Sequence, residues 1–456
     1  MGNKKYKLLL INPLNRRKTT VQREVISIYP PISLGIIAAL TPSHWEVEIL
    51  DEIFEEFEVR DADLVGITSL TPTVNRAYEI ATNFREKNIP VVLGGIHASM
   101  MPEEAMQFVD TVVKGEAENI WQQLINDFEN NKLKNIYEAQ RADIHKIPLP
   151  RYDLYNKAYE IGSIQTTRGC PMNCDFCSVH VFNGRKYRTR PVDEVVKEFI
   201  NMPQERIAFV DDNLCGYSKR TEDRLAEICK KIIDSGVRKK WFCSASMNIG
   251  ENPELLQIMA KAGCQMIFLG IESEVVDSLM AMNKSVNYKI GVDNFSRIYE
   301  NIHQAGIAVL GAFILGLESD TATSIRKRVD YILNSAVDAM QVTILTPLPG
   351  TVLYERLEKS GKLLYTNYPA DWERYNVTEL VYQPDHIGIE EFQHVTSEGW
   401  NTLYNSKALS KRIIKTAKAT RNPDAAKWAY SANVQYHNVF LEESHVRQDV
   451  KDLFIT

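Results

Sequence analysis

The stretch Arg168-Gly169-Cys170-Pro171-Met172-Asn173-Cys174-Asp175-Phe176-Cys177 places three cysteines in the spacing CxxxCxxC. Three thiolates this close in sequence can bind one corner of a four-iron cluster, which leaves one iron without a local protein ligand. An open metal position of this kind is where a cofactor or a substrate can react. A zinc site with His180 as fourth ligand is the alternative, but structural zinc sites usually have paired CxxC knuckles, and the surrounding chain lacks the second pair.

The remaining cysteines show no metal-ligand spacing. All seven cysteines of the chain lie between Cys170 and Cys264, so neither flanking region can hold a second cysteine-bound cluster. Cys215, Cys229, Cys243 and Cys264 are scattered, and we expect them to be small buried hydrophobic residues.

Before the cysteine motif, short apolar runs alternate with segments of helical spacing. The expected strands cover residues 6–12, 47–50, 64–69, 91–94 and 111–114, and the expected helices cover 32–40, 74–86 and 103–108. Short buried strands separated by helices predict a doubly wound parallel sheet of the Rossmann-like type. Ligands of such sheets bind beyond the carboxyl ends of the strands, and the absence of GxGxxG disfavours a dinucleotide.

From Ser163 the α/β alternation restarts with a strand that leads into the cysteine motif, and six strand–helix units are expected in all. Eight units would close a full barrel, so six predict a partial (β/α)6 barrel. Regularity fades after Gly350, and mainly helical segments then run to the end. The predicted organisation is a first domain over 1–135, a linker over 136–162, a partial barrel over 163–350 and a C-terminal substrate or closure region over 351–456.

Composition limits the partners and the location. A net charge of −6 gives no electrostatic reason to expect nucleic acid. No apolar run approaches the roughly 18 residues of a membrane-spanning helix, and no signal peptide is recognisable, so we expect a cytoplasmic protein. The basic segment Lys407–Arg421 predicts a solvated helix face, with peripheral contact to an anionic membrane as the alternative.

The cysteine motif occurs together with four strand-end motifs, at 209–213 (FVDDN), 269–273 (LGIES), 311–318 (GAFILGLE) and 346–351 (TPLPGT). In this combination the chain resembles radical S-adenosylmethionine (SAM) enzymes with an N-terminal cobalamin-binding domain, a family that includes hopanoid and bacteriochlorophyll methylases. The resemblance covers about residues 5 to 380 and is strongest in the cysteine motif. It implies that Cys170, Cys174 and Cys177 hold a 4Fe–4S cluster (four irons, four sulfides) whose open iron binds SAM and cleaves it to a 5′-deoxyadenosyl radical.

The resemblance also implies SAM contacts beside the last cysteine and at the strand ends. These residues are Phe176, Arg188, Arg190, Asp211, Asp212, Asn213, Ser246, Glu272, Gly311 and Gly316. Phe176 and the two glycines would lie near the adenine, and Ser246 near the ribose. Asp211, Asp212 and Asn213 would lie near the amino group, and Glu272 near the ribose or the amino group. Arg188 or Arg190 would pair with the SAM carboxylate, although both also fit a surface basic patch.

Cobalamin would lie against the first sheet. Its implied contacts are Thr68, Ser69, Gly94, Gly95, His97, Gly115 and Glu116. The family's mutase relatives supply an axial histidine from a DxHxxG motif after the first strand, whereas this chain reads Asn12-Pro13-Leu14-Asn15 there. Many radical SAM relatives hold cobalamin without such a ligand. For His97, a structural role in a loop is the alternative.

The function implied by the resemblance is cobalamin-dependent C-methylation of an unactivated carbon in a small molecule, either lipid-like or another metabolite. A flavodoxin-type or ferredoxin-type protein would donate the electron. The alternative is a cyclase, coupling or rearrangement enzyme on the same scaffold, which would not transfer a methyl group. Methylthiolation is disfavoured because no cysteine precedes Cys170, and a non-catalytic sensor is disfavoured because it needs no open iron.

Overall fold

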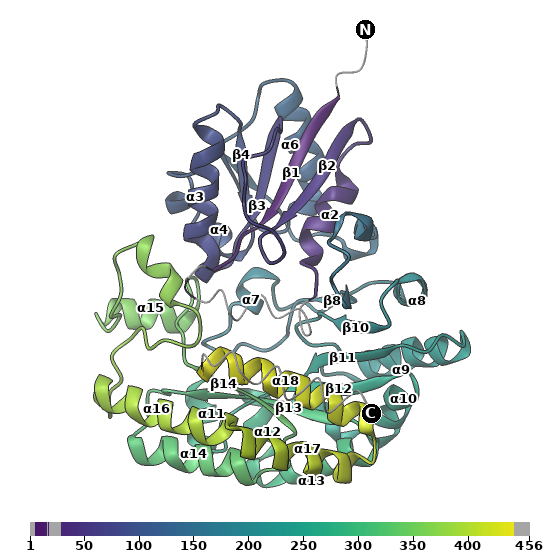
Figure 1. Cartoon of the computed structure of the whole chain (residues 1–456), viewed down its shortest axis with the longest axis vertical. Helices are drawn as coiled ribbons and strands as arrows, with labels where there is room; N and C mark the ends of the chain where they lie inside the picture. Colours follow the sequence, from purple (N-terminus) through teal and green to yellow (C-terminus); the bar gives the residue numbers. More distant parts are fainter. Residues whose placement is uncertain (1–4, 16, 18–28, 442–456) are drawn as a thin grey trace.

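The computed structural model describes residues 5–15, 17 and 29–441, and it contains two six-stranded parallel sheets stacked along the long axis of the molecule (Figure 1). The first sheet has the order β2-β1-β3-β4-β5-β6. Its strands are β1 (Tyr6–Asn12), β2 (Trp45–Asp51), β3 (Leu64–Thr68), β4 (Val91–Gly94), β5 (Thr111–Lys114) and β6 (Ile136–Glu138).

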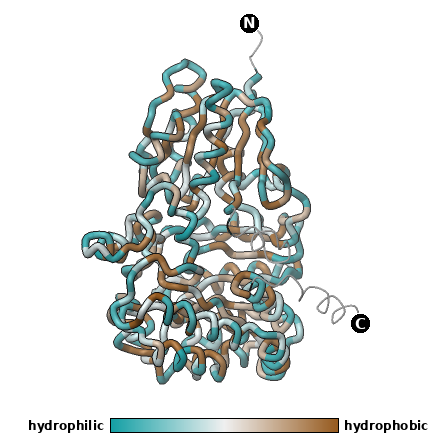
Figure 2. The backbone as a smooth tube through the Cα atoms, turned by 60° about the vertical axis from the view of Figure 1, so that its left-hand side comes forward, coloured by the Kyte–Doolittle hydropathy of each residue, from teal (hydrophilic) through white to brown (hydrophobic). Residues whose placement is uncertain are grey.

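Helices cover both faces of this first sheet. They are α2 (Ile32–Leu40), α3 (Val74–Arg85), α4 (Ile96–Met100), α5 (Pro102–Ala105) and α6 (Trp121–Glu129). In β1, Leu9 and Ile11 pack into the core on the α3 side, while Leu8 and Leu10 pack into the core formed with α2 and α6. Burial on both faces explains why these strands are continuous apolar runs, which Figure 2 shows as brown segments.

Part of the predicted linker 136–162 is a strand. Residues Ile136–Glu138 form β6, which adds a parallel edge strand to the first sheet beside β5. Its pattern is exposed, buried, exposed, with only Tyr137 in the core. Three residues with one buried side chain leave too weak a hydrophobic pattern to be recognised in the sequence.

The second sheet has the order β14-β13-β12-β11-β10-β7 and is also parallel throughout. Its strands are β7 (Ile161–Ile164), β10 (Arg206–Phe209), β11 (Lys240–Ala245), β12 (Cys264–Glu272), β13 (Ala308–Leu315) and β14 (Ala339–Ile344). The helices of the repeating units are α8 (Val192–Asn201), α9 (Lys219–Asp234), α10 (Pro253–Lys261), α13 (Phe295–Gln304) and α14 (Ala322–Asn334). Six strands and the five helices between them therefore form the predicted partial barrel.

The cysteine motif lies in a small hairpin segment that is not part of the six-stranded sheet. Strands β8 (Thr167–Arg168) and β9 (Arg188–Thr189) pair antiparallel, and α7 (Val179–Phe182) lies between them. The other four cysteines are buried in the barrel core, which confirms their prediction as small hydrophobic residues. Two short helices, α11 (Val276–Ala281) and α12 (Ser285–Ile290), follow β12.

The C-terminal region is mainly helical, as predicted. It contains α15 (Val352–Lys359), α16 (Ile389–Tyr404), α17 (Ser406–Thr420) and α18 (Pro423–Leu441). Helix α18 crosses the inner face of the partial barrel, where Trp428, Ala429 and Ala432 pack against Met266 and Leu310 (Figure 1). Within the described residues no helix has the length and apolar character needed to cross a membrane.

Candidate active site

Three cavities adjoin one another between the carboxyl edge of the first sheet and the interior of the barrel. The cysteine cavity has a volume of about 410 Å³ and the central cavity about 630 Å³. The glycine cavity, at the edge of the first sheet, has about 330 Å³. The cysteine and central cavities share Phe242, Ser244 and Phe268 as walls, and the central and glycine cavities share Thr68 and Leu70. The three cavities are therefore neighbours that share walls.

The three cysteines of the motif line the cysteine cavity together. All are free thiols, and Cys174 is 6% exposed. Burial raises the pKa of each thiol, that of Cys177 to about 11, so the thiolates need a positive partner to form. An iron–sulfur cluster supplies that partner, and three thiol donors around one cavity fit it.

Six of the residues that the sequence assigns to SAM line this same cavity. They are Phe176, Asp211, Asp212, Asn213, Ser246 and Glu272. The Nδ2 of Asn213 donates a 2.9 Å hydrogen bond to the Oγ of Ser246. This bond links the end of β10 to the end of β11 and fixes two polar groups at the cavity wall.

Asp211 is buried at the end of β10. Its Oδ1 accepts hydrogen bonds from the backbone N–H groups of Thr166 and Thr167 and from the Thr167 hydroxyl. Its Oδ2 is buried and has no hydrogen-bond partner among the described residues. Burial raises the pKa of Asp211 to about 6. A buried carboxyl group with one oxygen unsatisfied therefore stands at this wall of the cysteine cavity.

Glu272 at the end of β12 is held in an unusual conformation. Its φ is +66°, and the register between β12 and β13 shifts between Gly270 and Glu272. Its carboxylate accepts a 2.8 Å hydrogen bond from the Nζ of Lys284, whose pKa is raised by Glu272 and by the nearby thiols, although burial acts against this. A Cβ on Gly270 would come within 2.6 Å of that carboxylate and 2.7 Å of the ammonium, so a larger residue there would shift the pair.

Lys284 was not predicted from the sequence. It lines the cysteine cavity and brings the cationic end of the pair with Glu272 to the three thiols. Its only sequence signal is its charge, in a polar stretch that does not follow a strand directly. The fold brings it there because Asn283, its neighbour, donates to the backbone carbonyl of Asn173 in the cysteine loop.

Four other predicted SAM contacts do not line the cysteine cavity. Gly311 packs against Ile271, and Gly316 packs against Phe392. Arg190 is buried in an ion pair with Glu198 at 2.5 Å. Their sequence positions alone do not show that these side chains or backbones face away from the site.

Arg188 instead joins the two halves of the molecule. It and its cross-strand partner Arg168 both bind the buried carboxylate of Glu116, which follows β5 of the first sheet. Arg168 also pairs with Glu118 at 2.5 Å. Burial opposes ionisation of Glu116, but the hydrogen bond from Arg188 and the charge of Arg168 keep its pKa below the usual value. We call these four residues the interdomain clamp.

Six of the seven predicted cobalamin contacts line the glycine cavity. They are Thr68, Ser69, Gly94, Gly95, Gly115 and Glu116. A Cβ on Gly94 would meet nothing within 4 Å, so it would project into open space, whereas one on Gly95 would come within 2.5 Å of the Ser69 carbonyl oxygen. Because these glycines have no side chains, the edge presents exposed backbone beside open space, which suits a large flat cofactor.

His97 does not line these cavities. It is fully buried, with its ring nitrogens 3.2 Å from the Thr71 hydroxyl and 3.3 Å from the Glu104 carboxylate. Its ring also meets Trp372 edge-on at 5.1 Å. These contacts are those of a structural histidine, which was the alternative that the sequence left open.

Two protein families match the chain. The Radical SAM superfamily matches residues 164–332, and the B12 binding domain matches residues 19–125. Bacteriochlorophyllide d C-8(2)-methyltransferase of Chlorobaculum tepidum is 32% identical over 406 residues, which cover 84% of this chain and 87% of the relative. Hopanoid C-2 methylase of Rhodopseudomonas palustris is 28% identical over 435 residues, with 92% and 80% covered.

A solved structure has the same fold over nearly the whole chain. It is the radical S-adenosylmethionine methyltransferase TsrM from Kitasatospora setae, with tryptophan substrate and a SAM analogue bound. The two superpose with a TM-score of 0.72 and 17% identity, and the match covers 98% of this chain and 100% of that chain. The likeness confirms the predicted fold, a Rossmann-like sheet followed by a partial barrel.

Proposed function

This chain belongs to the radical SAM enzymes that carry a B12-binding domain, and we propose that it methylates an unactivated carbon of a small molecule. The observation that carries the proposal is the shared walls of the three cavities. Methyl transfer from cobalamin to a substrate radical requires both cofactors to reach one substrate. A central cavity that shares walls with the cysteine cavity on one side and with the glycine cavity on the other supports this arrangement.

When bound, the 4Fe–4S cluster and cobalamin supply electron transfer to SAM and a transferable methyl group. Cys170, Cys174 and Cys177, which line one cavity, would hold the cluster. The Oδ2 of Asp211, which has no hydrogen-bond partner among the described residues, would accept a hydrogen bond from the SAM amino group, and charge assistance would strengthen that bond.

Lys284 replaces the arginines as our candidate for the SAM carboxylate. It is the cationic side chain among those that line the cysteine cavity, apart from His180 if that ring is protonated. Burial and the charge of Arg185 lower the pKa of His180, which favours its neutral form. Glu272 orients the Lys284 ammonium and leaves its remaining donors for a ligand.

The electron donor and the surroundings of the enzyme complete the proposal. A flavodoxin-type or ferredoxin-type protein would deliver the electron to the cluster. Peripheral membrane contact by α17 stays a prediction. That helix buries Leu409 and directs Arg412 to the backbone carbonyls of Ile332 and Val337, while Ile414 is 57% exposed.

The test is an anaerobic reaction of reconstituted enzyme with cobalamin, reductant and SAM deuterated in its methyl group. We expect both S-adenosylhomocysteine and 5′-deoxyadenosine, with the label recovered on the cobalamin. Formation of 5′-deoxyadenosine alone, with no label on the corrinoid, would contradict methyl transfer and favour a cyclase or coupling enzyme. Enzyme without added cobalamin is the control for S-adenosylhomocysteine from other sources.

A further inference from the structure

The strands of the second sheet line the central cavity in rows. Residues two apart on one strand face the same side, and neighbouring strands pair in register, so side chains of one level line up across the sheet. Phe242 and Met266 form a deep row. Ser244, Phe268 and Leu310 form the next row toward the carboxyl ends of the strands. Both rows are apolar except for the hydroxyl of Ser244, so the deep part of the cavity suits an apolar molecule.

The third row ends in a polar side chain. It consists of Gly270, Ala312 and Gln341, which pair in register across β12, β13 and β14. Gly270 lines the cysteine cavity and Gln341 lines the central cavity, so this row lies at the level of the reacting end. The side-chain amide of Gln341 makes no hydrogen bond to another described residue. It can therefore donate to, or accept from, a polar atom of a bound molecule.

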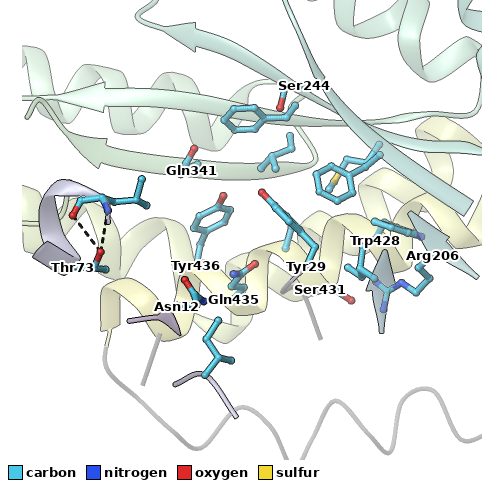
Figure 3. Close-up of a pocket in the computed structure, with 18 of the residues that line it drawn as sticks. Asn12, Tyr29, Thr73, Arg206, Ser244, Gln341, Trp428, Ser431, Gln435 and Tyr436 are labelled. Carbon is cyan, nitrogen blue, oxygen red and sulfur yellow. Dashed lines mark hydrogen bonds between the residues drawn. The ribbon is translucent and has the colours of Figure 1, made fainter. Parts of the chain in front are cut away.

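Two tyrosines bring hydroxyl groups to this part of the cavity. Figure 3 shows Tyr29, which precedes α2, and Tyr436 of α18 extending into the cavity toward the strands that carry Ser244 and Gln341. Burial raises the pKa of Tyr436, and the nearby Tyr29 raises it further, so its hydroxyl keeps its proton. Within the part of the chain that the structure describes, neither hydroxyl makes a hydrogen bond. Both can therefore donate to a bound molecule.

The charged side chain in this lining is already engaged by the protein. Among the described residues that line the central cavity only Arg206 is charged, and it lies over the ring of Trp428, 4.5 Å from the centroid, and pairs with Glu160 at 3.6 Å. An ion that enters an apolar cavity without a partner of opposite charge loses its hydration at a high cost. A neutral polar group loses less and recovers it through hydrogen bonds. The lining therefore favours an uncharged molecule.

From this arrangement we propose that the substrate is an uncharged, largely apolar molecule with a neutral hydrogen-bond acceptor, such as a carbonyl oxygen. The acceptor binds the amide of Gln341 and the hydroxyl of Tyr436, and the apolar part lies against Phe242 and Phe268. The bound acceptor holds the neighbouring carbon at the level of the cysteine cavity. This inference deepens the proposed function and rests on it for the word substrate, whereas the binding preference is a property of the cavity itself.

Three naphthalenes of nearly equal size test the preference for a neutral acceptor. 2-Acetylnaphthalene has a neutral carbonyl group, 2-naphthoate has a carboxylate, and 2-ethylnaphthalene has no polar group. Each competes with the fluorescent dye N-phenyl-1-naphthylamine for anaerobic enzyme loaded with cluster, cobalamin and SAM. Reductant is left out, so no turnover occurs. We expect the ketone to bind at least about tenfold more tightly than the carboxylate, which would be buried without a partner.

Substitution of the two binding groups tests the hydrogen bonds. Gln341→Leu and Tyr436→Phe should each weaken the ketone about fivefold and change 2-ethylnaphthalene less than twofold, because each removes a polar group and keeps most of the side-chain volume. Gln122→Leu, at an exposed glutamine of α6 outside the cavities, should change the binding of none of the three compounds. Trp428→Leu, which removes part of the apolar wall, should weaken all three and so assign their binding to this cavity.

Several outcomes would overturn the inference. It is wrong if 2-naphthoate binds as tightly as the ketone, or if Gln341→Leu and Tyr436→Phe both leave the ketone unchanged or weaken 2-ethylnaphthalene equally. A dye that does not bind at all would contradict an apolar cavity. Because no turnover is measured, enzyme that shows these preferences but transfers no methyl group would contradict the proposed function alone. Methyl transfer without these preferences would contradict this inference alone.

Discussion

The carboxyl edges of the two sheets differ in the kinds of residue that form them, although both sheets have six parallel strands. The edge of the first sheet is formed by glycines, where Gly94 offers empty space and Gly95 allows close backbone approach. The edge of the second sheet carries ionisable side chains, with Asp211 and Glu272 beside the cysteines. On this basis the first edge would hold a ligand by shape, and the second by charge and coordination. Substitutions should therefore act by filling space at the first edge and by removing donors at the second.

The largest expected effect is at the charged edge. Cys174→Ala removes one of three cluster ligands, and we expect SAM cleavage to fall by at least about a thousandfold because electron transfer needs the cluster. The measurements are iron and sulfide content and 5′-deoxyadenosine formation. Cys243→Ala is the matched control, since this cysteine is buried in the barrel core. Full cleavage by Cys174→Ala would contradict the assignment of the cluster.

At the glycine edge, adding a side chain should weaken cofactor binding, just as removing a cysteine should at the charged edge. Gly94→Leu would place an isobutyl group in the glycine cavity, and we expect corrinoid affinity to fall about a hundredfold while iron content stays normal. Gly388→Leu is the control, because a Cβ there also meets nothing within 4 Å and lies outside the cavities. Absorbance of bound cobalamin after desalting measures the effect. Unchanged binding in Gly94→Leu would place the cofactor elsewhere.

The edge of the first sheet also carries one charged residue, Glu116, which contacts the cysteine hairpin. Its substitution tests whether the two edges depend on each other. Glu116→Gln would leave Arg188 and Arg168 with less compensating charge in a buried site, a change that costs about 3 kcal/mol. We expect a clear drop in melting temperature. Glu138→Gln, in an exposed pair with Lys114, should cost little.

If the interdomain clamp also positions the cofactors, the variant will show a second effect. Glu116→Gln should raise the ratio of 5′-deoxyadenosine to S-adenosylhomocysteine, because the cysteine hairpin and the glycine edge would no longer be held together. A lower melting temperature with an unchanged product ratio would show that the clamp only stabilises the fold.

What the sequence could predict also differs between the two regions. The strands of the first sheet are buried on both faces, so runs such as Tyr6–Asn12 are apolar throughout and easy to recognise. The cysteine spacing is equally local. By contrast, the pairing of Arg188 with Glu116 joins residues far apart in the chain, and neither residue type indicates its partner. The sequence assigned both to cofactors, whereas the structure binds them to each other.

The interior of the barrel also contains tertiary contacts that the sequence could not predict. Helix α18 was predicted only as part of a helical end, but it forms a wall of the central cavity through Trp428 and Tyr436. Its position depends on the small side chains Ala308 and Ala339, which let it approach the sheet. Lys284 likewise reaches the cysteine cavity through a tertiary contact of its neighbour Asn283. Sequence patterns report which face is apolar, but they do not report what covers it.

The smallest expected effect concerns protonation at the charged edge. Because burial raises the pKa of Asp211 to about 6, its carboxylate is present above that pH and lost as the pH falls through it. If it accepts from the SAM amino group, the affinity for SAM should fall about fourfold between pH 7.5 and 5.5, in step with the loss of the carboxylate form. Asp211→Asn should bind SAM weakly with little pH dependence. The measurement is equilibrium binding of SAM to the reconstituted enzyme, and an equally steep pH profile in Asp211→Asn would assign the titration to another group.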